Sequence, residues 1–486
     1  MQQLFLEIIG EFMQKEKLTE FFGGKNFWKR ALVLAIPIAL QNMLTSSFTL
    51  VDTLMVGQLG DIALSSVGMA GQWSWLLNMV VFGISSGSAV FVSQYWGAQD
   101  VKNIHKITGM AVLASCIFAM CFLLTGAFFP ELVIKIFNRT PEVVSMGSAY
   151  LKLAVFSYPG VVLGAVLGAI LRSCEDVKIP VYSAAFTTLA NAFLDYALIF
   201  GKFGFPEMGV EGAALATCIS AWLGPITIII ACVLKKNILF TPIKNLFGFD
   251  KQMIKSFAKT ATPVVCNETF WGLGTVVYNV IFANMGYENF AAVTIIKTVE
   301  NLSYVFFIGL CNACCVMVGT SVGGGHIKRA LKDAKRFSIL IPLSGVIIGT
   351  VILLSRNQLV GLFNLSGELT ENTVFITKII FIIYALHLPV RTLPYTLIVG
   401  VFRSGGDTVN GAKIDLFSLW GISIPLTTVL AFVIKVPFVV AFAAMYLFED
   451  YLKCVLCIKH FLSNKWLIPV TEAGKNSLKE YLKTKK

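Results

Sequence analysis

Long apolar stretches recur along the whole chain, and few polar residues interrupt them. About twelve of these stretches approach or exceed the roughly 20 residues that an α-helix needs to cross a bilayer. Because backbone amides in lipid must find partners within their own segment, such stretches predict helices rather than open sheets. The pattern predicts an all-α polytopic membrane protein whose spans are residues 31–57, 62–95, 107–129, 147–171, 179–201, 210–234, 257–285, 290–320, 337–355, 374–402, 412–434 and 437–461.

Composition agrees with this fold class. The 486 residues are 56% hydrophobic and only 14% charged, whereas soluble domains carry about 25% charged residues. Eleven cysteines include a C-x-x-C spacing at Cys311 and another at Cys454, but no second pair or histidine cluster accompanies either one. We therefore expect no cofactor and no bound metal other than a coupling Na+.

The positive charges are distributed unevenly. Of the 39 Lys and Arg, about 30 fall on one side of the membrane if the twelve spans alternate. This bias predicts a multi-pass protein of the bacterial inner membrane with both termini in the cytoplasm. The bases then act as topology signals that also touch anionic lipid, and we expect no nucleic-acid partner despite the net charge of +12. Residues 1–30 have the spacing of an amphipathic helix on the inner leaflet, although a frayed tail fits equally well.

The second half of the chain repeats the first at an offset of about 226 to 231 residues. The stretch 37–60 (PIALQNMLTSSFTLVDTLMVGQLG) and the stretch 263–286 (PVVCNETFWGLGTVVYNVIFANMG) both begin with proline, end with glycine and contain one buried acid. Because six spans fall in each repeat, the two bundles share one orientation, related by a pseudo-twofold axis along the membrane normal. The expected units are a cytoplasmic N-terminus (1–30), an N-terminal six-helix bundle (31–234), a cytoplasmic linker (235–256), a C-terminal six-helix bundle (257–462) and a basic cytoplasmic tail (463–486).

Asp52 is the first candidate functional residue. A charge within a span costs several kcal/mol unless it faces protein or water. Helical spacing places Gln41 on the same polar face as Asp52, and this face is expected to line a cavity. In the fifth span, Asn191 and Asp195 lie one turn apart, again on one face.

These residues predict an ion-coupling site in the N-terminal bundle. Two carboxylates, the amide of Asn191, the hydroxyl of Thr217 in the sixth span and a backbone carbonyl freed by Pro37 would supply most of the about six oxygens that a hard cation needs. Two acids held close together would also suit a proton. The sequence leaves Na+ and H+ as alternatives.

The seventh span carries a second set of polar residues. Glu268, Trp271, Thr275 and Asn279 share one helix face, and an acid one turn from a tryptophan can hold an organic cation. The alternative is that Glu268 pairs with a buried base, for which the tenth span offers Arg391. Together with Gln41, these residues form the expected substrate cavity.

These motifs resemble the multidrug and toxic compound extrusion (MATE) transporters, prokaryotic members of the multidrug/oligosaccharidyl-lipid/polysaccharide flippase superfamily, over about residues 28–462. The resemblance rests on the residues above, on LRSCEDVKIP after the fourth span with FRSGGDT after the tenth, and on GVEGAALAT in the sixth. It implies two bundles around a central cleft that rock between outward- and inward-facing states. By position, Asp52, Asn191, Asp195 and Thr217 match the ion site of one prokaryotic branch, and Glu268 matches an acid of the other. That other branch has an aspartate where this chain reads HLPVRTLPY, with Arg391.

The function that follows is secondary efflux of a small, cationic, amphipathic substrate by antiport with Na+ or H+, by a protein expected to be a monomer. A flippase for lipid-linked sugars or precursors is the nearest alternative, although such proteins usually have a strongly basic cleft. An intramembrane enzyme is disfavoured, because no H-E-x-x-H and no nucleophile with an evident base occurs. We therefore expect no enzymatic activity.

Overall fold

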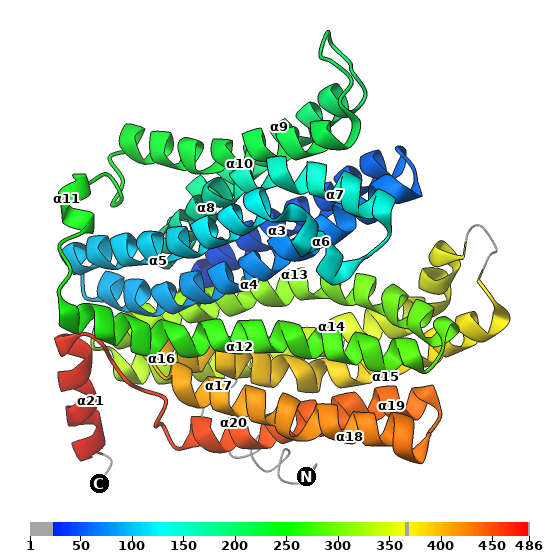
Figure 1. The fold of residues 1–486 in the computed structure, drawn as a ribbon. Helices are drawn as coiled ribbons and strands as arrows, with labels where there is room; N and C mark the ends of the chain where they lie inside the picture. The colour runs from blue at the N-terminus through cyan, green and yellow to red at the C-terminus, as the bar shows by residue number, and fades with distance from the viewer. Residues whose placement is uncertain (1–22, 365–368, 485–486) are drawn as a thin grey trace.

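The computed structural model describes residues 23–364 and 369–484. The described residues form helices without a named strand, which confirms the all-α prediction (Figure 1). The first bundle consists of α3 (Lys25–Gly57), α4 (Asp61–Gly97), α5 (Val101–Phe128), α6 (Pro130–Phe137), α7 (Pro141–Ala154), η1 (Val155–Ser157), α8 (Tyr158–Ser173), α9 (Lys178–Ile199) and α10 (Gly209–Leu234).

A short connecting helix, α11 (Ile243–Leu246), leads to the second bundle. Several of its spans contain π-helical segments, named η2 to η5, and a last helix follows the bundle. These elements are α12 (Lys251–Asn284), α13 (Tyr287–Gly323), α14 (Ile327–Phe363), α15 (Glu371–Tyr395), η2 (Thr396–Phe402), α16 (Arg403–Gly405), α17 (Thr408–Leu416), η3 (Phe417–Ser423), α18 (Ile424–Thr428), η4 (Val429–Ile434), α19 (Phe438–Tyr446), η5 (Leu447–Tyr451), α20 (Leu452–Leu462) and α21 (Glu472–Thr484).

The two repeats agree at the turn after their first helix. Gly60 and Gly286 both adopt positive φ, +101° and +131°, a region that residues with a Cβ rarely enter. The predicted amphipathic helix of residues 1–30 lies largely outside the described residues. Where the chain becomes described, α3 already begins at Lys25, and α12 begins at Lys251, inside the predicted linker.

Nine helices or helix pairs in the described part are long and apolar enough to cross a membrane. The other three expected spans, α9, α12 and α19 to α20, each carry charged side chains. Asp195 lies in α9, Glu268 in α12 and Lys453 in α20.

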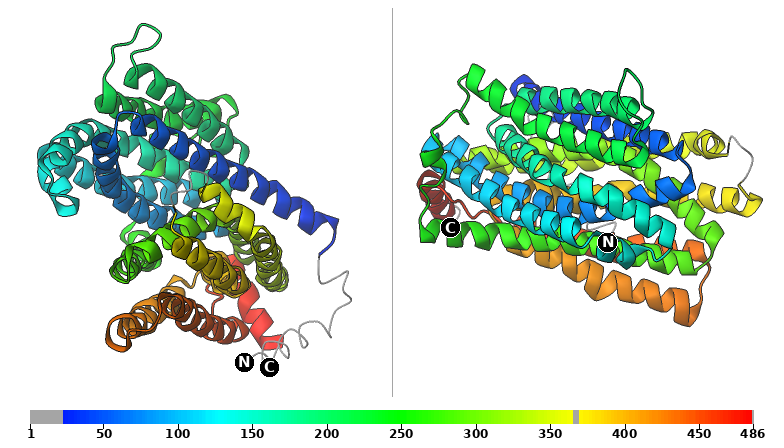
Figure 2. Two further views of the ribbon diagram at one scale, coloured as in Figure 1. Left: turned by 90° about the vertical axis from the view of Figure 1, so that its right-hand side faces the viewer. Right: turned by 45° about the horizontal axis from the view of Figure 1, so that its top comes forward.

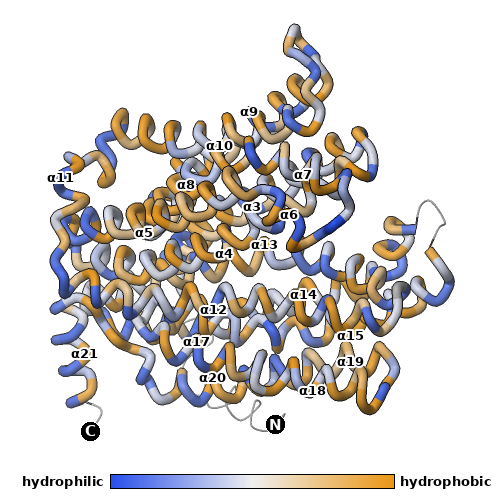
Figure 3. The backbone as a smooth tube through the Cα atoms, in the orientation of Figure 1, coloured by the Kyte–Doolittle hydropathy of each residue, from blue (hydrophilic) through white to orange (hydrophobic). Residues whose placement is uncertain are grey.

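Hydrophobic residues predominate along the middle of the helices, and hydrophilic residues are more frequent towards their two ends (Figure 3). Several large apolar side chains are more than 70% exposed, among them Leu354 at 76%, Val433 at 74% and Leu234 at 78%. Water would disfavour such a surface, whereas lipid does not. The helices therefore have the surface of a membrane-embedded bundle.

The two bundles meet through their innermost helices (Figures 1 and 2). Helix α4 packs on α12 and α13, and α3 packs on α13. A Cβ at Gly87 would lie only 2.8 Å from the Cα of Ala261, so α4 and α12 need a glycine to approach this closely. Gly323 lies even closer to the first bundle, because a Cβ there would be 1.9 Å from the carbonyl oxygen of Gln94. These approaches fall in the half of the molecule near the connection between α10 and α12, which we call the linker end.

Part of the predicted basic tail is folded onto the linker end. Trp466 is fully buried and stacks on Phe461. The amide of Ile468 donates to the carbonyl of Gly405 at 2.7 Å, and that of Val470 donates to Gln94 Oε1 at 2.8 Å. Because Gln94 belongs to the first bundle, this segment ties both bundles together.

Candidate transport site

Two acids meet inside the first bundle. Asp52 is on α3 and Asp195 on α9, two helices that pack together. The two carboxyl groups lie close enough to interact electrostatically, and Asp195 is fully buried. The structure thus brings together the two acids that the sequence analysis paired.

No base neutralises these acids in the described part of the chain. Asp52 Oδ1 and both oxygens of Asp195 are buried and receive no hydrogen bond from another described group. Two carboxylates in an apolar interior repel each other and are costly to bury. The pair therefore suits a proton shared between the acids or a small cation bound to them.

The remaining predicted ion-site residues divide into two groups. Asn191 is one turn from Asp195 on α9, and its amide nitrogen is buried without a partner among the described residues. Thr217 is on α10, which packs on α9. By contrast, at about 1.5 Å per residue Pro37 lies about 22 Å from Asp52 along α3. Gln41, which was predicted for the substrate cavity, lies about 16 Å from Asp52 along the same helix. The structure does not bring these two to the acid pair.

Tyr150 is a member of the cluster that sequence reasoning missed. It is on α7 and only 8% exposed. Its hydroxyl lies near Thr217 and near the carboxyl groups of Asp52 and Asp195. No charge or motif in the sequence distinguishes this tyrosine. Its position beside the acids depends on how α7 packs in the bundle, which only the structure shows. The cluster therefore contains a hydroxyl from a fourth helix, α7, in addition to the groups on α3, α9 and α10.

Glu268 in the second bundle has a basic partner, but a different one from that considered in the sequence analysis. Arg403 Nη2 donates to Glu268 Oε1 at 2.6 Å, and its other terminal nitrogen donates to Ser86 Oγ of α4 at 3.0 Å. Arg391 instead pairs with Glu300 at 2.9 Å and donates to the Tyr304 hydroxyl at 3.0 Å. Arg403 rather than Arg391 pairs with Glu268, because Arg403, at the end of the tenth span, points towards α12 and α4.

The other predicted cavity residues of α12 differ in their exposure and in their hydrogen bonds. Trp271 is 37% exposed, and Thr275 donates to its carbonyl at 3.2 Å. Asn279 accepts a hydrogen bond from Lys297 of α13. The face predicted from spacing is therefore partly open near Trp271 and partly occupied by side-chain contacts.

Further acids of the second bundle are also paired. Lys453 of α20 donates to Asp415 and to Glu449, both at 2.6 Å. Asp415 receives an additional bond of 3.0 Å from Asn267. In contrast to the first bundle, the second pairs Glu268, Glu300, Asp415 and Glu449 with Lys or Arg. Asp450 is an exception, because it is 4% exposed and its Oδ2 receives no hydrogen bond from a described group.

Comparison with known proteins explains this combination of a repeated helical fold and buried acids. The MatE family model matches residues 37–197 and 263–429, and so covers both repeats. The chain belongs to the MatE family. It is therefore a membrane transporter and not an enzyme.

Relatives of this MatE chain span nearly its whole length. It is 29% identical to the probable multidrug resistance protein NorM of Thermotoga maritima, over 90% of this chain and 93% of the relative. It is 24% identical to the probable multidrug resistance protein YoeA of Bacillus subtilis, covering 87% and 90%.

Solved structures share the fold of this MatE chain. A MATE transporter in its bent conformation superposes with a TM-score of 0.80 at 16% identity, over 94% of this chain and 97% of that one. The eukaryotic MATE transporter AtDTX14 gives a TM-score of 0.79 at 18% identity, over 94% and 99%. The resemblance stated from sequence motifs is thereby confirmed at the level of family and fold.

Proposed function

We propose that this MatE protein is a secondary active transporter that exports organic cations or drugs in exchange for Na+ or H+. The observation that carries the proposal is the Asp52–Asp195 pair, a half-buried and a fully buried acid without a described base. An inward-moving cation supplies the positive charge that this pair needs. The multidrug resistance proteins among the relatives support drugs as the substrate class.

In this proposal, Asp52 and Asp195 take up the ion, and Asn191, Thr217 and Tyr150 surround it. Pro37 is too far along α3 to act as a ligand. A proline inside a helix removes one backbone hydrogen bond, so Pro37 contributes instead by allowing α3 to bend when the site is loaded.

The contact between the bundles supports a rocker-switch mechanism. Gln94 Nε2 donates to the carbonyl of Ser404 at 2.9 Å, and Gln94 Oε1 accepts from Val470. Opening the linker end would break these bonds and separate α4 from α12. Ion and substrate can drive such a change only if they prefer different states, because equal binding to both shifts nothing.

We propose a substrate cavity between the bundles lined by Gln41, Glu268, Trp271, Thr275, Asn279 and Arg391. Two of its charges are balanced within the protein, because Glu268 pairs with Arg403 and Arg391 pairs with Glu300. The exposed ring of Trp271 then contributes cation–π attraction that does not require a free acid. A flexible amphipathic cation is the substrate that fits this arrangement.

The proposed setting is the bacterial inner membrane, with the protein as a monomer. The positive-inside bias places the linker end and both termini in the cytoplasm. Efflux then runs from the linker end to the opposite end, where Asp52 and Asp195 lie near the far ends of their helices.

The decisive experiment measures efflux of a cationic dye from proteoliposomes under an imposed Na+ gradient and, separately, a proton gradient. Wild type is compared with Asp52→Asn, which cannot release a proton or offer a carboxylate to Na+. Asp61→Asn is the matched control, because Asp61 is exposed in the first turn of α4. Transport by wild type and the control under one gradient, and none by Asp52→Asn, is the expected result.

Two outcomes would overturn the proposal. Transport against a gradient by Asp52→Asn would show that the acid pair is not the coupling site. Scrambling of labelled lipid without dye efflux, in the same proteoliposomes, would favour the flippase alternative.

A further inference from the structure

Four polar side chains follow one face of α9 from the acid pair towards the linker end. They are Asp195, Asn191, Thr187 and Ser183, each four residues from the next, so each lies about one helical turn from its neighbour. At about 1.5 Å per residue, the row is about 18 Å long. The proposed ion site uses only its first two members.

The neighbouring helix α10, which packs on α9, meets this row with a glycine and a further hydroxyl. A Cβ at Gly224 would lie 3.6 Å from Thr187 Oγ1. Ser183 Oγ lies 2.7 Å from Thr227 Oγ1 and donates to the carbonyl of Gly224 at 2.9 Å. We call Asn191, Thr187, Ser183 and Thr227 the polar seam. It runs between α9 and α10, inside the first bundle.

Two groups in the polar seam have no hydrogen-bond partner within the described part of the chain. These are Thr187 Oγ1 and Asn191 Nδ2, and both atoms are buried. The adjacent threonine differs, because Thr188 donates to the carbonyl of Ala184 at 2.6 Å. Buried polar groups are nearly always hydrogen-bonded, and leaving one unpaired is costly. Thr187 and Asn191 are therefore placed to bind an ion or the water that accompanies it.

Apolar side chains close the polar seam on the side of the linker end. Ile179 lies one turn before Ser183 on α9 and packs with Leu171, Ile228 and Cys232. These four apolar side chains, which we call the apolar plug, are each at most 3% exposed. A charge among them would lose its hydration without gaining polar contacts. The apolar plug therefore blocks an ion in this conformation.

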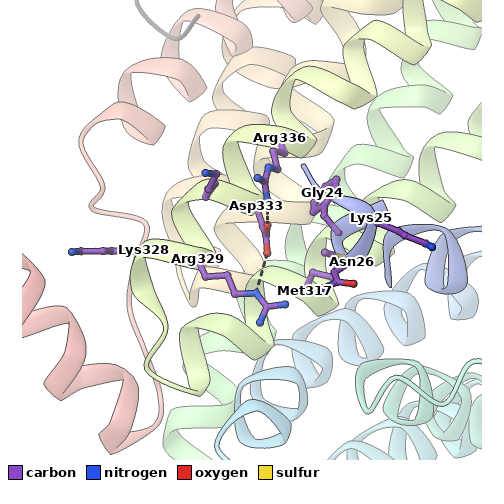
Figure 4. Close-up of a pocket in the computed structure, with 10 residues that line it drawn as sticks. Gly24, Lys25, Asn26, Met317, Lys328, Arg329, Asp333 and Arg336 are labelled. Carbon is purple, nitrogen blue, oxygen red and sulfur yellow. Dashed lines mark hydrogen bonds and ion pairs between the residues drawn. The ribbon is translucent and has the colours of Figure 1, made fainter. Parts of the chain in front are cut away.

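A cavity of about 390 Å³ opens beyond the apolar plug. Val177 and Lys178 line it and directly precede Ile179 at the start of α9, and Asn237 beyond the end of α10 also lines it. It shares no lining residue with the cavity of about 570 Å³ between the starts of α3 and α14, where Asp333 lies between two arginines (Figure 4). The polar seam, the apolar plug and the smaller cavity thus follow one another along α9, from the acid pair to the linker end.

We propose that the coupling ion leaves the acid pair along the polar seam and reaches the linker end when the apolar plug opens. Thr187 is a positioning residue of this route, because its unpaired hydroxyl lies between Asn191 and Ser183. The inference rests on the proposed function, since only an ion that has occupied the acid pair can leave it. It adds that ion and substrate use separate paths, the ion within the first bundle and the substrate between the bundles.

The test compares Thr187→Leu with the matched control Thr188→Leu, using the purified full-length protein. Dye efflux from proteoliposomes gives the maximal rate, and the rise in apparent Tm on adding the coupling ion reports equilibrium binding. Leucine at position 187 removes the hydroxyl and fills the seam beside Gly224. The maximal rate should fall at least about tenfold, because an ion on the route loses a charge-assisted hydrogen bond.

The ion-induced rise in Tm should stay at the wild-type value in Thr187→Leu, because the acid pair is intact. Thr188→Leu should match wild type in both measurements, and so should Thr187→Ser, which keeps the hydroxyl. If Thr187→Leu does not fold, Thr187→Val removes the hydroxyl without changing the shape of the side chain, and Thr188→Val is then its control.

Asp52→Asn separates this inference from the proposed function on which it rests. Transport by Asp52→Asn would overturn both. An inactive Asp52→Asn together with equal maximal rates in Thr187→Leu and Thr188→Leu would overturn the route and leave the proposed function standing. A smaller ion-induced rise in Tm in Thr187→Leu would also overturn the route, because Thr187 would then belong to the binding site itself.

Discussion

The two bundles are repeats of one another, yet they treat buried acids in opposite ways. In the first, Asp52 and Asp195 face each other without a described base. In the second, Glu268 pairs with Arg403, Glu300 with Arg391, and Asp415 and Glu449 with Lys453. The same fold thus contains one pair of acids without a described base and, in the other bundle, four acids that each contact a Lys or Arg.

This difference predicts opposite results from the same kind of substitution. Neutralising an acid that has no base leaves no charge stranded, so stability is preserved while ion uptake is lost. Neutralising one member of a buried ion pair leaves its partner uncompensated, which is strongly destabilising. Acids without a base are therefore expected to take up the transported ion, whereas ion-paired acids are expected to stabilise the fold.

The largest expected effect is the loss of transport in Asp195→Asn. Dye efflux should fall to the level of empty liposomes, because an amide neither takes up a proton nor offers a carboxylate to Na+. The apparent Tm, followed by tryptophan fluorescence, should stay the same or rise. Efflux above about a tenth of the wild-type rate, or a marked loss of Tm, would contradict the contrast between the bundles.

The second effect is a loss of stability in Glu268→Gln. Leaving Arg403 buried without a counter-charge should lower the free energy of unfolding by about 3–5 kcal/mol. The double variant Glu268→Gln/Arg403→Gln should recover part of this loss, because it removes both charges.

Glu142→Gln is the control for this series, since Glu142 is exposed at the start of α7. Its apparent Tm should equal that of wild type. If the double variant is as unstable as the sum of the two single variants, Glu268 and Arg403 do not act as a pair.

A smaller effect should distinguish the roles of two tyrosines in the first bundle. Tyr150→Phe removes the hydroxyl near Thr217 and the acid pair, and one hydrogen bond is worth about 1 kcal/mol. The concentration of coupling ion that gives half-maximal efflux should therefore rise about fivefold. Tyr158→Phe, whose hydroxyl is 3.1 Å from Ser74 Oγ, should leave this concentration unchanged. Equal values in the two variants would show that Tyr150 only packs.

The sequence was sufficient to predict the fold class, the internal repeat and the pairing of Asp52 with Asp195. The length of an apolar segment predicts a membrane span directly. Asp52 and Asp195 lie at similar depths on helix faces that are turned inward in one bundle, which brings them close together. The partner of Glu268 was not predictable in this way. Arg391 and Arg403 are both in the tenth span region, and only the rotation of that helix and its π-helical segment η2 decide which one faces α12.

Tyr150 and the tail were missed for a related reason. A tyrosine on a buried face looks like ordinary packing until the helices around it are placed. The tail segment around Trp466 and Val470 is short and follows a basic stretch, so its composition resembles a solvated terminus. Its burial depends on contacts with Gly405 and Gln94, which are distant in sequence.

The smallest expected effect concerns the turns that follow the fourth and tenth spans, where the repeat places Asp176 and Asp407. Asp176 accepts a bond of 2.6 Å from Asn237. Asp407 accepts bonds from His460 at 2.7 Å and from Asn410 at the start of α17. Burial opposes ionisation of Asp407, but these hydrogen bonds outweigh it and hold its pKa below the ordinary 3.8.

A carboxyl group whose pKa is lower in the folded state stabilises the protein above its unfolded pKa, and this contribution is lost as pH falls through the folded pKa. The apparent Tm of wild type should therefore decline as pH falls from about 5 to 3, and Asp407→Asn should show a shallower decline from a lower starting value. Asp176→Asn provides the matched change in the first repeat. If the apparent Tm of Asp407→Asn declines with falling pH as steeply as that of wild type, other acids account for the decline. Asp407 would then not contribute to the pH dependence of stability.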